Sequence, residues 1–381
     1  MKNVIPKSDR GAASASAPSK DAVAFSNGSG YLAMMRDLFL QIVGGGLSMR
    51  AGDDQPAIPS DIRHVHLLDT AVASTNVGDE IIVEAALRHI GPSLENCYVS
   101  SSSSHDGLGP SGARLVEQAD LVLFLGSNAL SPHFHIGKPS IWHLKQADVP
   151  LLSGKLVLVG VGAKAHYKDV EPRQMRLLNR LLHKDLAHSV RDATAASIVR
   201  ECGRTANNTS CPSLWQFADR VPVSPGKADG VTFTLTAHKP DPNDRAMIKI
   251  LREEYRRLWF WPQQPRDLDY LRSLDCADGV EIIAPNLAAY DTHLHEHETD
   301  VVGTRLHGTI RGLHFGRRII VISIDNRAED ISREVGLPAV GRSRIGSELG
   351  ERLRNPEEVS LSLPADNIAT FTRGLRDFVR V

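Results

Sequence analysis

Two short apolar runs, LVLFL at residues 121–125 and LVLVGV at residues 156–161, indicate how this chain folds. Both runs are too short for ordinary helices and meet glycine at their ends, which is typical of strands buried on both faces of a parallel sheet. Further strands are predicted at 64–69 and 188–191, and helices at 79–89, 172–182 and 193–201. Strands that alternate with helices predict an α/β fold.

The same alternation returns in the second half of the chain. Strands are predicted at 231–236, 280–284, 300–303 and 318–324, and helices at 243–257, 304–315, 328–335 and from Pro364 onward. The stretch RVPVSPGKADG at 220–230 contains two prolines and two glycines and is predicted to be a linker. We therefore expect two doubly wound Rossmann-like domains, residues 61–222 and 223–381, that face a cleft. Ligands of such sheets bind outside the carboxyl ends of the strands.

The first sixty residues are expected to form an extension of different character. Residues 11–20 (GAASASAPSK) are small and polar, and are predicted to lack a packed structure. Residues 31–43 (YLAMMRDLFLQIV) predict a short apolar helix closed by three glycines, without the basic start or cleavage site of a secretory signal. This helix could dock on the body or on a partner subunit, or contact a membrane surface, and the sequence leaves both roles open.

Composition narrows the class of protein. The 381 residues include 44 Lys and Arg against 45 Asp and Glu, so the basic excess of a nucleic-acid-binding protein is missing. No apolar run reaches the roughly 18 residues of a membrane-spanning helix. The cysteines are widely spaced, without a CxxC pair, at positions 97, 202, 211 and 276. A soluble, cytoplasmic protein with reduced thiols is predicted, with no nucleic-acid partner and no zinc site.

Several candidate cleft residues follow predicted strands. In TNVGDE at 75–80, Asn76 can cap a helix, Gly78 allows close backbone approach and Asp79 lies in the first turn. This segment is either a well-capped turn or a loop that lines the substrate, and both interpretations remain open. Further candidates for the cleft are Asn128, His133, His135, Lys164 and His166, although a histidine at a strand end is more often structural.

Two patterns that suggest a cofactor are incomplete. The glycines at 160 and 162 do not extend to the G-x-G-x-x-G pattern of dinucleotide-binding proteins. The segment HLHEH at 293–297 lacks the H-E-x-x-H spacing of zinc enzymes, and we expect it to be solvated surface rather than a metal site.

Arginine and histidine at strand ends point to an anionic ligand. Arg191 ends a predicted strand just before Asp192, which is a natural helix cap. In VVGTRLHGTIRG at 301–312, a strand ends at Gly303 and a helix begins with Arg305 and His307 in its first turn. Cations at this end oppose the helix dipole and destabilise the helix, so the pattern favours anion binding over a structural role.

These motifs resemble the signature of the polysaccharide pyruvyl transferase family. The resemblance rests on residues 300–325 (DVVGTRLHGTIRGLHFGRRIIVISID), on NVGDE at 76–80 and on SVRD at 189–192, and spans roughly residues 65–338. It implies a GT-B-like fold and transfer of pyruvate from phosphoenolpyruvate to two hydroxyls of a sugar, which gives a cyclic ketal and phosphate. By position, Arg305, Leu306 and His307 match the family's donor-binding motif, and Arg191 matches its second arginine. Where relatives tend to have a glycine triplet and an acidic residue, this chain has GSN at 126–128, which leaves the acceptor open.

The resemblance and the charges together predict a mechanism. Arg191 and Arg305 would bind the phosphate and carboxylate of the donor, and His307 would act as general acid and base, with His133, His135 or His166 as its partner. No step demands a metal or an organic cofactor. A lipid-linked acceptor would bring the protein to the inner face of the membrane, and an oligomer is also compatible with the sequence. The rival interpretations are a nucleotide-sugar glycosyltransferase on the same frame and a non-catalytic sugar- or phosphate-binding protein.

Overall fold

The computed structural model describes residues 62–380, except 139, 165, 168, 219–225 and 356–358. The expected N-terminal extension, with its predicted helix at 31–43 and polar segment at 11–20, lies outside the described residues, and so does the first part of the predicted linker. In the part of the chain that the structure describes, no helix is both long and apolar enough to cross a membrane.

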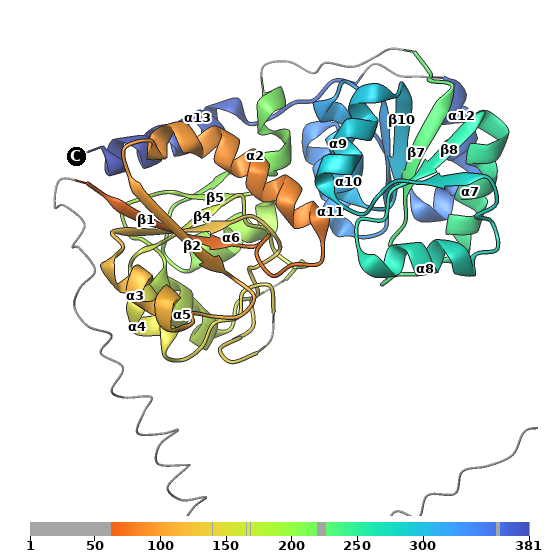
Figure 1. Ribbon diagram of the computed structural model, residues 1–381. Coiled ribbons are helices and arrows are strands. Elements are labelled where there is room, and N and C mark those ends of the chain that lie inside the picture. The colour runs from red at the N-terminus through yellow and green to blue at the C-terminus, as the bar shows by residue number, and fades with distance from the viewer. Residues whose placement is uncertain are drawn as a thin grey trace, which may run out of the picture. The chain divides into compact units, whose positions relative to one another are not determined.

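The first half of the described chain forms a parallel sheet with the strand order β2-β1-β3-β4 (Figure 1). A parallel pair, β5-β6, adjoins β4, and Val190 of β5 forms a bridge with Val161 just after β4. The strands are β1 (His64–Asp69), β2 (Tyr98–Ser103), β3 (Leu121–Leu125), β4 (Leu156–Val159), β5 (His188–Val190) and β6 (Ala206–Asn208). The helices are α2 (Val77–Leu94), α3 (Pro110–Gln118), α4 (Asp148–Leu152), α5 (Pro172–Leu181), α6 (Ala193–Glu201) and the 3₁₀ helix η1 (Pro212–Phe217).

Strand β3 shows why continuous apolar runs predict this sheet. Successive side chains of a strand point to opposite faces, so a strand covered on both faces must be apolar throughout. Val122 and Phe124 pack in one core, which α3, α5 and α6 cover. Leu121, Leu123 and Leu125 pack in the opposite core, which includes α2. The expected burial on both faces is confirmed.

Strand β2 is an element that the sequence did not predict. Its sequence YVSSSS is polar because it lies at the edge of the sheet, where one side has no neighbouring strand. Its serines bond instead to the strand beside it: Ser100 Oγ lies 2.7 Å from His64 Nε2 and 2.8 Å from His66 Nδ1. A polar run of this kind resembles a loop in the sequence, since its partners become visible only in the sheet.

The second half forms a parallel sheet with the order β12-β11-β10-β7-β8-β9. Counted along the chain from β7, this is the 3-2-1-4-5-6 order of Rossmann folds. Its strands are β7 (Gly230–Thr234), β8 (Arg257–Phe260), β9 (Val280–Ile282), β10 (Thr299–Gly303), β11 (Ile319–Ser323) and β12 (Ala339–Gly341). Its helices are α7 (Pro242–Glu254), α8 (Pro265–Ser273), α9 (Leu287–Glu296), α10 (Leu306–His314), α11 (Asn326–Val335), η2 (Arg342–Arg344), η3 (Ile345–Leu349) and α12 (Gly350–Arg354). The predicted α/β class with two doubly wound Rossmann-like domains is confirmed.

Two expectations for this half are wrong. The helix predicted at 243–257 ends at Glu254, and Arg257 begins β8, because Trp259 and Phe260 are buried in the sheet. Aromatic residues favour strands at such positions. The segment HLHEH belongs mainly to helix α9, and His293 is buried, with Nε2 2.9 Å from Thr232 Oγ1. It is therefore not solvated surface throughout. Among the described residues there is no cluster of three or more side chains suited to a metal.

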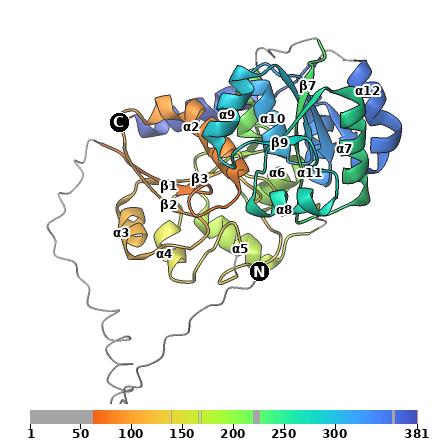
Figure 2. The ribbon, with the colours of Figure 1, turned by 45° about the vertical axis from the view of Figure 1, so that its right-hand side comes forward.

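The last helix, α13 (Ala365–Val379), packs on the first sheet (Figure 1). Its apolar residues Ile368, Phe371, Leu375 and Val379 recur every three or four positions and therefore share one helix face. They join the core that includes α2. The expected boundary, which assigned residues 223–381 to one domain, therefore fails at this helix. Figures 1 and 2 also show α2 beside α10, and Ile81 of α2 shares a core with Leu306 and Ile310.

Candidate active site

A cavity of about 330 Å³ is lined by residues from both sheets. Most of its residues follow the carboxyl ends of strands β1, β2 and β3 in the first sheet, of β5 in the pair beside it, and of β8 and β10 in the second sheet. Ligands bind at these ends in such folds. The lining residues are Ala73, Ser74, Thr75, Asn76, Asp79, Ile82, His105, Ser127, Asn128, Ile141, Arg191, Gln264 and His307.

Arg191 supplies a permanent positive charge to this cavity. It directly follows β5, is only 2% exposed, and its guanidinium donates to Asn128 Oδ1. Its side chain passes over Gly162, where an added Cβ would lie 2.2 Å from Arg191 Nε, so glycine is required there. Asp192 lies 3.9 Å from Arg191 Nε and caps α6 through a bond from Ala195 N (2.7 Å). Asn128, Asp192 and Gly162 together hold Arg191 in place.

His307 lines the cavity from the second sheet. It lies in the first turn of α10, directly after β10, and is buried with 6% exposure. Its Nε2 lies 3.5 Å from the Sγ of Cys211. A histidine and an arginine from different sheets therefore line one space.

Arg305 occupies a different place from the one expected. It is not one of the lining residues, and its guanidinium bonds from Nε to Asp267 Oδ2 (2.9 Å) and from Nη2 to Asp267 Oδ1 (2.5 Å) and Gln264 Oε1 (2.7 Å). Asp267 is fully buried in the first turn of α8. The expectation that Arg305 binds the donor is therefore not supported, because a buried carboxylate already engages its fork. Leu306 packs in the apolar core.

We expect Asp267→Ala to lower the free energy of unfolding by about 3–5 kcal/mol, because it leaves the Arg305 guanidinium buried without its carboxylate. Urea unfolding measures this change. The matched control is Asp269→Ala, whose partner is Arg272 at 3.6 Å and whose pair is largely exposed (65%/80%). That variant should lose less than about 1 kcal/mol. A loss of less than about 1 kcal/mol in Asp267→Ala, no larger than in the control, would show that the Arg305 pair contributes little to stability.

Asp79 is a carboxyl group at the cavity wall in the first turn of α2. It is largely buried, and Ser74 Oγ donates to its Oδ2 (2.7 Å). Burial raises the pKa of Asp79, while the bond from Ser74 and the charges of His105 and Arg191 oppose the rise. Its proton is therefore less easily lost than that of an ordinary aspartic acid.

His105 is a cavity residue that the sequence analysis missed. It follows the polar strand β2, and its Nε2 lies 3.0 Å from the carbonyl oxygen of Thr70. A carbonyl oxygen can only accept a hydrogen bond, so His105 Nε2 is the donor and carries the hydrogen. Because strand β2 was not predicted, His105 was not recognised as a residue that follows the carboxyl end of a strand, and so it was not placed in the cleft.

Asn76 and Gly78 act at a junction of the two sheets. Gln263 Nε2 donates to Asn76 Oδ1 (2.7 Å), and Gly308 N at the start of α10 donates to Gln263 Oε1 (3.0 Å). An added Cβ at Gly78 would lie 2.5 Å from Gln263 Nε2. The close approach expected at Gly78 therefore involves Gln263. This single amide joins the starts of α2 and α10.

Four other expected cleft residues do not line the cavity: His133, His135, Lys164 and His166. His133 is exposed and bonds Glu171 (2.8 Å), whereas His135 is buried and bonds Gln174 (3.0 Å). Burial lowers the pKa of His135. His166 Nε2 lies 3.1 Å from Asp330 Oδ2 of α11. None of the three histidines is therefore placed as the expected partner of His307.

The family model described as "Polysaccharide pyruvyl transferase" matches residues 76–326. The chain belongs to this family. The resemblance drawn from the three sequence motifs is therefore confirmed, and membership of the family implies a transferase with a saccharide acceptor. No curated protein matches the sequence significantly.

Solved structures with a similar chain path include several sugar-nucleotide enzymes. The UDP-GlcNAc 2-epimerase from Methanocaldococcus jannaschii is 12% identical to this chain, with a TM-score of 0.48. The match covers 83% of this chain and 99% of that chain. A putative UDP-N-acetylglucosamine 2-epimerase from Listeria monocytogenes is 12% identical (TM-score 0.47), over 83% and 91% of the two chains. A glycosyltransferase from Rickettsia africae ESF-5 is 10% identical (TM-score 0.41), over 84% and 93%. This likeness does not extend to substrate or reaction.

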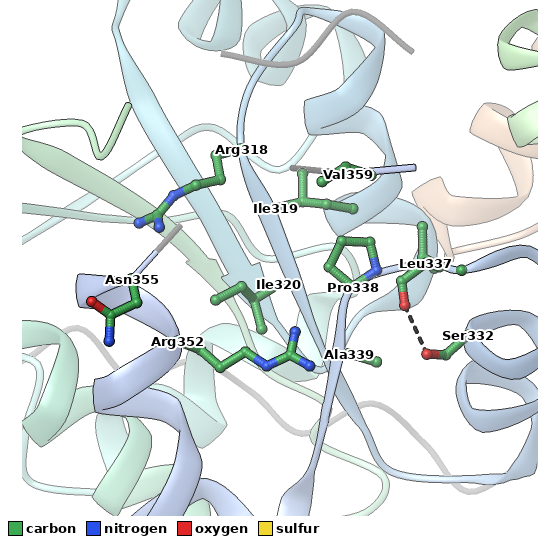
Figure 3. A pocket seen from close by; sticks show the side chains of 11 residues that line it. Arg318, Ile319, Ile320, Ser332, Leu337, Pro338, Ala339, Arg352, Asn355 and Val359 are labelled. Atoms are coloured by element: carbon green, nitrogen blue, oxygen red, sulfur yellow. Dashed lines mark hydrogen bonds between the residues drawn. The ribbon is translucent and has the colours of Figure 1, made fainter. Parts of the chain in front are cut away.

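A second cavity has a volume of about 220 Å³. It is lined mainly by residues at the amino ends of β11 and β12 (Figure 3). Its arginine Arg318 bonds Asp300 through Nε (3.0 Å) and Tyr255 Oη through Nη2 (2.9 Å). Ligands of doubly wound sheets bind at the opposite, carboxyl ends. The cavity with Arg191 and His307 is therefore the candidate active site.

His314, at the far end of α10, is expected to make the stability of the protein depend on pH. Its Nε2 donates to the carbonyl oxygen of Ser213 (2.7 Å), and burial lowers the pKa of His314 to about 4 from 6.5. Because the unfolded chain binds this proton first, the stabilisation is complete above about pH 6.5 and is lost as the pH falls toward 4. We expect His314→Gln to reduce the loss of unfolding free energy between about pH 7.5 and pH 5 by about 2 kcal/mol. Denaturant titrations at both pH values test this, and equal losses in the two proteins would contradict it.

Proposed function

We propose that this chain transfers the pyruvyl group of phosphoenolpyruvate to two hydroxyls of a saccharide, forming a cyclic ketal and releasing phosphate. The observation that carries the proposal is one cavity lined by Arg191 from the first sheet and by His307 from the second. Membership of the family supports the transferase class and the saccharide acceptor.

The charges of the cavity suit a small anionic donor. Phosphoenolpyruvate carries a phosphate and a carboxylate, and the planar fork of Arg191 can donate to two oxygens of either group. The first turns of α2 and α10 both reach the cavity, at Asp79 and His307. Helix starts add positive potential, worth about 0.3–1 kcal/mol each toward an anion. In this scheme Arg191 is the main cationic side chain that binds the donor. Arg305 does not contact the donor but holds Gln264, which lines the cavity.

The reaction requires one proton at the donor's C3 and the loss of two protons from the acceptor. In the scheme, His307 delivers a proton to C3, so that the CH₂ group becomes CH₃ and C2 becomes an oxocarbenium-like centre. The first sugar hydroxyl adds to C2 and loses its proton. The bond between C2 and the phosphate oxygen then breaks, and the second hydroxyl adds in its place. One hydroxyl proton restores His307, and the other leaves with phosphate.

Asp79 is the second proton-transferring group in this scheme. It lines the same cavity as His307 from the other sheet, and its raised pKa favours proton exchange closer to neutral pH than an ordinary carboxyl group allows. We assign Asp79 to the deprotonation of the second hydroxyl, and Asp79 passes that proton to the departing phosphate, while the proton of the first hydroxyl restores His307. This replaces the histidine partner expected from the sequence.

The direct test uses phosphoenolpyruvate labelled separately in its phosphate and in its three-carbon unit. With a panel of free, nucleotide-linked and lipid-linked saccharides, we expect the carbon label in the saccharide and the other label in inorganic phosphate. Turnover that requires a nucleotide sugar would instead support a glycosyltransferase. Donor binding without turnover on any acceptor would support a binding protein. A lipid-linked acceptor would place the reaction at the inner face of the membrane.

A further inference from the structure

A buried cysteine, located just before the 3₁₀ helix η1, contacts His307. Cys211 directly precedes η1 and is fully buried, and its Sγ lies 3.5 Å from His307 Nε2. The two residues come from opposite halves of the fold, yet Cys211 packs in the same apolar core as Leu306, the neighbour of His307. The contact therefore lies within a packed junction and is not a chance approach of exposed side chains.

The sulfur of Cys211 already accepts one hydrogen bond. Ser213 Oγ donates to Sγ over 3.1 Å, and Ser213 is itself fully buried. A thiol sulfur has a second lone pair, so it can also accept an N–H from His307. The sulfur therefore contacts both Ser213 Oγ and His307 Nε2.

The other histidine that α10 presents to this segment shows the same arrangement. His314 lies seven residues after His307, and its Nε2 donates to the carbonyl oxygen of Ser213 (2.7 Å). Arg311 Nη1 lies 3.1 Å from His314 Nδ1 and has only protons to give, so the single proton of neutral His314 is on Nε2. Residues 211–213 thus present acceptors to the Nε2 atoms of both histidines.

We propose that Cys211 is a positioning residue for His307. Its sulfur accepts the Nε2–H of His307 and keeps that nitrogen protonated through the reaction, so that Nδ1 is the atom that gains and loses the proton. The imidazolium form then gives its Nδ1 proton to the donor's C3, and the neutral form keeps the bond from Nε2 to sulfur. The inference rests on the proposed function only for this catalytic consequence.

Nitrogen NMR of histidine-labelled protein tests the tautomer without any turnover. In the wild-type protein, neutral His307 should show the shifts of an Nε2–H imidazole. Cys211→Ala should move these shifts toward a mixture of the two tautomers, and Cys211→Ser should restore them because a hydroxyl also accepts. A wild-type Nδ1–H imidazole, or unchanged shifts in Cys211→Ala, would overturn the proposal.

Kinetics provides the second readout. Cys211→Ala should lower kcat about fivefold, as expected for one lost hydrogen bond, with KM for phosphoenolpyruvate within about twofold. The matched control is Cys202→Ala, which removes another buried thiol from a core on the first sheet and should leave the tautomer and kcat unchanged. If the wild-type protein has no turnover with phosphoenolpyruvate, the proposed function fails and the NMR result still decides the role of Cys211.

Discussion

Arg191→Ala is expected to weaken phosphoenolpyruvate binding by about a hundredfold. The guanidinium is buried at the cavity and held by Asn128, so its bonds to an anionic donor are preorganised. Charge-assisted hydrogen bonds contribute about 1.5–3 kcal/mol each, and a hundredfold corresponds to about 2.7 kcal/mol. Calorimetric titration with phosphoenolpyruvate measures the change directly.

Two further variants separate charge from geometry. Arg191→Lys keeps the positive charge but loses the planar fork, and we expect about a tenfold loss of affinity. Arg176→Ala removes an exposed arginine of α5, which does not line the cavity, and should bind the donor normally. Wild-type affinity in Arg191→Ala, with the protein folded, would remove Arg191 from the donor site.

His307→Ala is expected to lower kcat about a thousandfold, within the range for loss of a general acid and base. Donor affinity should change by less than about fivefold, because Arg191 supplies most of the charge that binds the donor. Single-turnover measurements at saturating phosphoenolpyruvate separate the two quantities. His295→Ala, on the exposed side of α9, is the control and should retain full activity. Near-normal turnover in His307→Ala would contradict the assignment.

The sequence predicts this fold best where a pattern within a few consecutive residues is enough to identify an element. A strand such as β3 is apolar throughout because both faces are covered, and that pattern is visible in five consecutive residues. Strand β2 cannot be predicted in the same way, because its serines form hydrogen bonds with His64 and His66 of the neighbouring strand β1. Helix α13 is predicted from its periodicity, but nothing in that periodicity specifies the sheet on which it packs.

The candidate site shows the same limit. Arg191 is predicted correctly as a residue at a strand end, and the structure places it in the cavity. Arg305 has the same local signal, but its carboxylate partner Asp267 lies 38 residues earlier in the chain, at the start of α8. Local sequence cannot tell whether an arginine faces a ligand or a buried carboxylate, because that choice depends on a contact between distant segments.

The central claim is that Arg191 and His307 meet one donor molecule in the cavity that the two sheets share. A crystal structure with phosphoenolpyruvate and an unreactive acceptor analogue tests it most directly. We expect donor oxygens on the Arg191 guanidinium, with the donor's C3 beside His307. Phosphoenolpyruvate bound instead in the cavity beside Arg318, at the amino ends of β11 and β12, would contradict it.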